Sequence, residues 1–170
     1  TGWELLWNEK YTGKTLMFGN SRDAFGIAQF GLQAVIAKGY EVVVTGPNRD
    51  HVEKIEQLGA RFVEIPMKKN GLNPLEDLAY QKALKKLFLA EQPDVVLGYT
   101  SKPVIYGSIA AKKAKVPHKA AMVTGVGYAF TANTKKAKLV RAVMSVLYKR
   151  AFRCADTVIF QNNDETRNCF

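Results

Sequence analysis

The feature that most constrains the fold of this chain is a regular alternation between short β-branched runs and segments with helical spacing. Six runs have the length and composition of β-strands: Thr15–Phe18, Glu41–Thr45, Arg61–Ile65, Asp94–Leu97, Lys119–Val123 and Thr157–Phe160. The segments between them have the apolar periodicity of amphipathic helices: residues 23–38, 50–58, 74–90, 103–115 and 136–153. Such alternation is typical of parallel sheets whose strands are joined by right-handed helical crossovers. The sequence therefore predicts an α/β protein: a Rossmann-like three-layer sandwich with a mostly parallel sheet of six or seven strands.

The length of 170 residues fits one domain, because domains commonly contain roughly 100–200 residues. We divide the chain into an N-terminal extension, residues 1–13, and a Rossmann-like domain, residues 14–170. No run approaches the ~20 consecutive apolar residues that a membrane-spanning helix needs. The sequence reaches Phe170 inside a segment that reads as the beginning of a helix. We therefore expect the natural chain to continue beyond this residue.

The formal net charge of +10 calls for a negatively charged partner. Nucleic acid, an anionic membrane surface and a phosphate-bearing substrate all fit such a charge. The sequence carries no RNA-recognition motif or stacking platform, so nucleic acid is not expected as a partner. Cys154 and Cys169 have no metal-ligand or CxxC spacing, which predicts free thiols in a reducing cytoplasm. No metal-ligand cluster, P-loop or nucleophile motif is present, and the sequence identifies no catalytic residue.

The loop after the first predicted strand is a candidate phosphate site. It reads Gly19-Asn20-Ser21-Arg22 and lacks the GxGxxG dinucleotide fingerprint, so NAD binding is not predicted. Its backbone N–H groups stand at the expected start of a helix, where anions bind. A plain helix cap by Ser21 or Asp23 explains the same residues and is the slightly favoured interpretation.

The loop from Thr124 to Thr131 is the most informative stretch. Gly125 and Gly127 allow close approach of the backbone to a ligand, and Tyr128 and Phe130 offer flat surfaces of the kind that sugars contact. A tight connection without a ligand is the alternative. Three lysines on other strand-end loops would add an anion-binding pocket, although each alone is typical of a solvent-facing side chain: Lys68, Lys69 and Lys102.

The predicted helix 136–153 has a basic stripe and contains no acidic residue. The stripe follows spacings of three and four: Lys138, Arg141, Ser145, Lys149 and Arg153. Leu139, Val140, Val143, Leu147 and Ala151 are expected to pack on the sheet, with Tyr148 and Phe152 near the stripe. This pattern suits an anionic membrane surface, or else a solvated face. The predicted membrane contacts are Lys138, Arg141, Tyr148, Lys149, Phe152 and Arg153.

Several stretches occur together and in a fixed order: GYEVVVTGP, LGARFVEIPMKKNGLNPLEDL, PDVVLGYTSKPVIYGSIAAKKAKVP, VTGVGYAFT and KAKLVRAVMSVLYKRAFRCADTVIFQNNDE. In these stretches the chain resembles the N-terminal domain of glycosyltransferase family 4, especially bacterial transferases that elongate undecaprenyl-diphosphate-linked glycans in capsule or glycoprotein biosynthesis. The resemblance implies a retaining GT-B enzyme with a nucleotide-sugar donor, a UDP-sugar by expectation, and no obligatory metal or other cofactor in this domain. The implied location is cytoplasmic, on the inner face of the bacterial plasma membrane.

The resemblance also implies how the work is divided between two domains. This half receives a lipid-linked glycan acceptor, while a second, C-terminal domain binds the donor, so this part alone is expected to be inactive. A non-catalytic membrane-recruiting subunit that pairs with a separate donor-binding chain is the alternative. The acceptor-binding residues implied by position are Asn73, Thr100, Lys102, Thr124, Gly125, Gly127, Tyr128 and Thr131. Relatives often carry an aromatic-His-x-Arg grouping where this chain has residues 24–28, so Arg22 would have to replace it.

Overall fold

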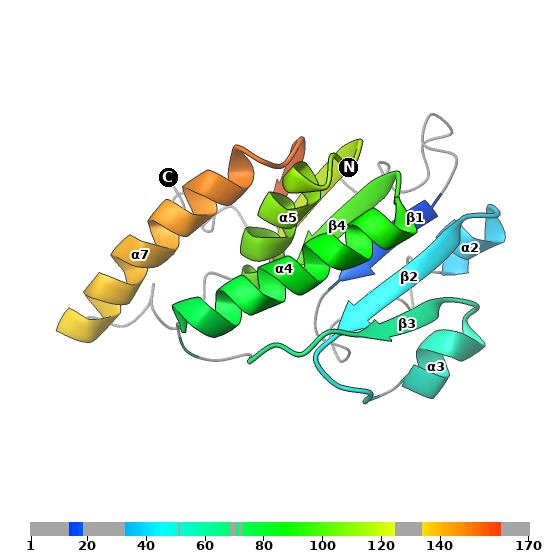
Figure 1. Ribbon diagram of the computed structural model, residues 1–170, viewed down its shortest axis with the longest axis horizontal. Coiled ribbons are helices and arrows are strands. Elements are labelled where there is room, and N and C mark those ends of the chain that lie inside the picture. The colour runs from blue at the N-terminus through cyan, green and yellow to red at the C-terminus, as the bar shows by residue number, and fades with distance from the viewer. Residues whose placement is uncertain are drawn as a thin grey trace.

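A six-stranded parallel sheet forms the centre of the fold in the computed structural model, which describes residues 14–18, 33–50, 52–68, 71, 73–124 and 134–160 (Figure 1). Its strands are β1 (Lys14–Phe18), β2 (Glu41–Gly46), β3 (Arg61–Glu64), β4 (Val95–Tyr99), β5 (His118–Val123) and β6 (Thr157–Phe160). They are ordered β3-β2-β1-β4-β5-β6, and each neighbouring pair is parallel. This order is that of a Rossmann fold. The predicted fold class is confirmed.

Helices cover both faces of the sheet and produce three layers. They are α2 (Gln33–Ala37), α3 (Val52–Gln57), α4 (Pro74–Glu91), the π-helical turn η4 (Pro103–Gly107), α5 (Ser108–Lys113) and α7 (Lys135–Phe152). Val42 and Val44 of β2 pack with α2 and α3, whereas Val43 packs with α4 and α5 on the other face. Adjacent residues of a strand point to opposite faces, so a valine run can supply both cores at once. All three valines are at most 1% exposed.

The end of the sheet formed by β5 and β6 has a separate hydrophobic core beneath α7. Val104, Ile105 and Ile109 of η4 and α5 meet β5 and Tyr148 of α7 there. In Figure 1, α4, α5 and α7 lie on the same side of the sheet, and α7 is at the far end of the molecule from β3 and α3. None of the helices within the described ranges has the length and apolar content that crossing a bilayer requires.

Most predicted element boundaries agree with the structure to within two residues. The predicted helix 103–115 differs, because its first turn is the π-helical η4 and only Ser108–Lys113 is α-helical. Of the predicted helix 23–38, the structure describes residues 33–38, of which Gln33–Ala37 are α-helical. The extension 1–13 and residues 161–170 lie outside the described residues.

The helix α7 presents a different side to the core from the one predicted. Tyr148, expected beside the basic stripe, is 0% exposed, while Leu139, expected on the sheet, is 68% exposed and Val143 is 42% exposed. Leu147 and Ala151 do pack toward the core as predicted. The large Tyr148 ring removes more apolar area from water than a valine does, so the helix rotates to bury it. Phe152 is also drawn toward the core: its side chain is half-buried, and the centroid of its ring lies 5.5 Å from that of Tyr148.

Candidate functional site

The strand order reverses between β1 and β4, and ligands of open parallel sheets bind at this switch point, beyond the carboxyl ends of the strands. The predicted site residues that the structure describes at this edge come from three connections. The turn from Thr100 to Lys102 follows β4, Asn73 and the first turn of α4 follow β3, and Thr124 follows β5. The structure thus brings four of the predicted acceptor-binding residues to one edge: Asn73, Thr100, Lys102 and Thr124.

A buried polar cluster joins α4 to the start of η4 at this edge. Lys102 Nζ donates to Asp77 Oδ1 at 2.7 Å, and the Tyr106 hydroxyl donates to Asp77 Oδ2 at 3.0 Å. The side chains of Asp77 and Lys102 are only 5% and 11% exposed. Burial, reinforced by Asp77, raises the pKa of Tyr106, so this hydroxyl stays protonated at neutral pH and acts as a donor. We call Asp77, Lys102 and Tyr106 the Asp77 cluster.

The turn held by the Asp77 cluster is strained. Thr100 has φ of 72°, in the left-handed region that a β-branched residue rarely adopts. Its carbonyl accepts from Val104 N at 2.9 Å and so closes the first turn leading into η4. Strained residues and π-helical turns both occur preferentially at functional sites, where surrounding contacts hold them in place. Through its hydrogen bond to Asp77, Lys102 helps to hold this turn in place.

A cavity of about 490 Å³ opens beside the cluster, between the loops after β2 and β3 and the first turns of α4. Lys68 and Glu76 face each other at this cavity with Nζ and Oε1 2.6 Å apart. Its lining is mostly apolar with a few charged groups, as is usual for small-molecule sites: Pro47, Pro66, Met67, Lys68, Glu76, Asp77, Ala79, Tyr80 and Ala83.

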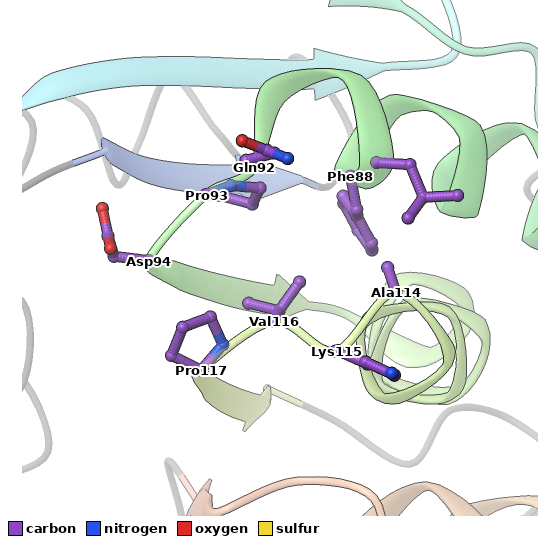
Figure 2. Close-up of a pocket in the computed structure, with 9 residues that line it drawn as sticks. Phe88, Gln92, Pro93, Asp94, Ala114, Lys115, Val116 and Pro117 are labelled. Atoms are coloured by element: carbon purple, nitrogen blue, oxygen red, sulfur yellow. The ribbon is translucent and has the colours of Figure 1, made fainter.

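A second cavity, of about 260 Å³, lies at the opposite edge of the sheet (Figure 2). Pro93 and Asp94 precede β4, and Pro117 precedes β5, so the cavity is at the amino ends of these strands. Parallel sheets bind ligands at the other edge. The candidate site is therefore the edge that carries the Asp77 cluster and the larger cavity.

Asn73 has a structural role whatever it contacts in a ligand. Its side chain caps α4 by accepting from Leu75 N at 3.2 Å, and Pro74 occupies the first helical position. We predict that Asn73→Ala lowers the free energy of unfolding by about 0.5–2 kcal/mol, because the backbone donor loses its partner. Asn73→Asp retains an acceptor and should stay within about 0.5 kcal/mol of the parent. Urea denaturation of the two variants tests this, and equal losses for both would contradict the cap.

The other predicted acceptor-binding and phosphate-binding residues lie outside the described residues. They are Gly125, Gly127, Tyr128 and Thr131 of the glycine-rich loop, and Gly19, Asn20, Ser21 and Arg22 of the candidate phosphate loop. Their roles stay predictions, as does acceptor binding by the four residues that the structure brings together.

Asp77 and Tyr106 were missed by sequence reasoning. Asp77 stands in the first turn of a helix, where an acidic residue is already explained by the helix dipole. The signal that would have found it is topological: Lys102 follows β4, and both crossovers start at the same edge of the sheet. Within the described ranges, no three His, Cys, Asp or Glu side chains gather as a metal site.

The predicted membrane contacts divide into two groups. Lys138, Lys149 and Arg153 are exposed, and Arg141 is half-buried. Tyr148 is wrong as a surface contact because its side chain is fully buried, and Phe152 packs between Tyr148 and Phe160. Burying these large aromatic rings in the core removes more apolar area from water than leaving them on the helix surface would.

Comparison with known proteins places this geometry in a family. The sequence profile of the family described as glycosyl transferase 4-like matches residues 14–162. An N,N'-diacetylbacillosaminyl-diphospho-undecaprenol alpha-1,3-N-acetylgalactosaminyltransferase from Campylobacter jejuni is 35% identical over 126 residues, which are 72% of this chain and 32% of that protein. The chain thus spans about a third of the length of this curated relative.

Solved structures of low sequence identity share the fold. MurG from Acinetobacter baumannii superposes with a TM-score of 0.60 at 12% identity, over 89% of this chain and 42% of MurG. A UDP-GlcNAc 2-epimerase from Neisseria meningitidis, solved with UDP-GlcNAc bound, gives 0.54 at 16% identity, over 89% and 47%. The fold is that of one Rossmann-like half of a GT-B protein. With a profile match that runs from β1 past the end of β6, the chain belongs to the glycosyl transferase 4-like family.

Proposed function

We propose that this chain is the acceptor-side domain of a glycosyltransferase that transfers a sugar from a nucleotide-sugar donor to a lipid-linked glycan. The observation that carries the proposal is the 35% identity, over 126 residues, to a transferase whose name specifies a diphospho-undecaprenol acceptor. The donor in this proposal is a UDP-sugar, and the setting is bacterial capsule or glycoprotein biosynthesis at the inner face of the plasma membrane.

In this proposal the acceptor lies along the carboxyl edge of the sheet. Thr100 and Thr124 supply hydroxyl groups there, and the glycine-rich loop 125–131 approaches the acceptor sugar. The Asp77 cluster holds the β4 turn in its strained form, so that acceptor groups meet a preorganised edge. Preorganisation favours transfer because reacting groups are then already oriented.

The second half of the enzyme contributes the donor site in this proposal, through a C-terminal domain or a partner subunit. The retaining stereochemistry is likewise part of the proposal. The two described carboxylates that line the cavity at this edge are both paired, Asp77 with Lys102 and Tyr106, and Glu76 with Lys68. This arrangement agrees with front-face attack, in which the leaving diphosphate takes the acceptor proton.

A transfer assay with the full-length protein tests the proposal. The protein is incubated with a panel of UDP-sugars and a polyprenyl-diphosphate-linked disaccharide, and products are separated by mass and analysed by NMR. We expect one UDP-sugar to give a trisaccharide lipid with the anomeric configuration of the donor retained. The free reducing disaccharide serves as the matched control and should react at least about 10-fold more slowly.

Two results would overturn the proposal. One is conversion of UDP-GlcNAc to its 2-epimer without any acceptor, because structures of such epimerases share this fold. The other is equal transfer to the free and the lipid-linked disaccharide, which would remove the lipid diphosphate from recognition.

A further inference from the structure

The helix α7 carries an aliphatic ridge on its outer side. Leu139 and Val146 are each 68% exposed and Val143 is 42% exposed. At roughly 100° per residue these three positions fall within an arc of about 60°, so they form one continuous strip. We call Leu139, Val143 and Val146 the α7 ridge.

The packing of α7 fixes the ridge on the outside. Ala137, Tyr148 and Ala151 on the opposite side are at most 5% exposed, and Met144 and Leu147 pack against the same core. The helix therefore already buries one apolar face against η4 and α5. The α7 ridge is a second apolar face that the described residues leave uncovered.

Positive charge surrounds the ridge. Among the described side chains, the exposed cations of α7 and its C-cap are Lys135, Lys138, Lys149, Arg150 and Arg153. Two of them precede the ridge or flank its beginning, and three follow it at the end of the helix. No acidic residue occurs between Lys135 and Ala155. An aliphatic strip with cations at both ends suits a surface that is anionic outside and hydrocarbon inside.

We propose that α7 lies flat on an anionic lipid bilayer, with the α7 ridge inserted among the acyl chains and the surrounding cations against headgroup phosphates. An 18-residue helix is roughly 27 Å long, and amphipathic helices of this kind bind in the plane of the interface. Figure 1 places α7 at one end of the molecule. A second copy of this chain is a poor occupant, because each copy carries a formal charge of +10.

This inference deepens the proposed function and rests on it in one respect: a lipid-linked acceptor would reach the site along the same surface. The geometry differs from a purely electrostatic contact. Salt screens headgroup attraction but leaves inserted apolar side chains in place. Binding through the ridge should therefore persist in part when the salt concentration is raised.

Vesicle flotation of the full-length protein tests the surface. The vesicles contain phosphatidylcholine alone or with 30% phosphatidylglycerol, at 0.1 M and 0.5 M NaCl. We expect Leu139→Ser/Val143→Ser/Val146→Ser to lower the partition coefficient on anionic vesicles at least about 10-fold at both salt concentrations. The variant Lys138→Gln/Lys149→Gln/Arg153→Gln should bind at 0.1 M NaCl only about as well as the parent binds at 0.5 M, and should show little further change at 0.5 M.

The chain offers a matched control on another helix. Leu75, Leu78 and Leu89 of α4 are 80%, 46% and 54% exposed, so their triple serine variant removes a similar amount of exposed apolar surface. This control should bind vesicles like the parent. Circular dichroism and thermal melts check that all variants fold.

Three outcomes overturn the inference: ridge and control variants that bind equally, a parent that does not bind, or a parent dimer that the ridge variant dissociates. Transfer to a short-chain, water-soluble acceptor analogue separates this inference from the proposed function. The ridge variant should retain the parent's kcat/KM on that analogue. If the parent bound vesicles but had no transferase activity, the proposed function would be contradicted while the inference about the α7 ridge would still hold.

Discussion

Replacing Asp77 by alanine should lower the free energy of unfolding by about 3–5 kcal/mol, because it leaves the Lys102 ammonium group buried without its counter-charge. The Tyr106 hydroxyl loses its acceptor in the same variant. Urea denaturation of the purified protein at neutral pH measures the loss. A loss of this size would make the Asp77 cluster one of the largest single contributions to the stability of the fold.

Two controls distinguish the effect of breaking a buried ion pair from the effect of removing any acidic side chain. Glu76 is the preceding residue and pairs with Lys68, but both side chains are well exposed, so Glu76→Ala should cost less than about 1 kcal/mol. The triple variant Asp77→Leu/Lys102→Met/Tyr106→Phe removes all three polar partners together and should be more stable than Asp77→Ala. Equal losses for Asp77→Ala and Glu76→Ala would contradict the buried cluster.

The second large effect concerns the orientation of α7. Tyr148→Ala should lower the free energy of unfolding by about 3–5 kcal/mol, because it empties the centre of the core between η4, α5 and β5. Leu139→Ala, on the same helix, should change the free energy by less than about 0.5 kcal/mol because that side chain already faces water. Guanidinium denaturation of the two variants gives both values. A larger loss for Leu139→Ala would mean that α7 is rotated relative to the structure described above.

The sheet could be predicted because its strands leave a strong local signal. A buried parallel strand is apolar on both faces, and runs such as Glu41–Gly46 read as strands without reference to the rest of the chain. Glycine at position 59 marks the end of α3 in the same way, since its φ of 88° is left-handed. These signals depend only on a few neighbouring residues, so they can be recognised from the sequence without knowing the rest of the fold.

The face of α7 could not be predicted because its sequence is apolar on more than one side. Counting aliphatic residues favoured Leu139 and Val143 as core, while the structure chooses Tyr148 and Ala151. The choice depends on the shape of the space above β5, where small alanines admit the helix and an aromatic ring fills the gap. That shape is set by residues of other elements, so it cannot be read from the sequence of the helix alone. The same reason hid the Asp77 cluster, which joins residues 25 and 29 positions apart.

The central place of β1 in the sheet has a consequence for synthesis. β1 leaves the ribosome before both of its neighbours, and it pairs with β2 on one side and with β4 on the other. The chain must grow from Phe18 to Val95 before the second pairing can begin, which takes roughly 4–15 s at the usual rates of translation. Throughout that interval the nascent sheet has an open edge at β1, the kind of edge that recruits other chains. The centre of the sheet is thus completed only when β4 arrives, and until then the open side of β1 is a place where another chain could pair.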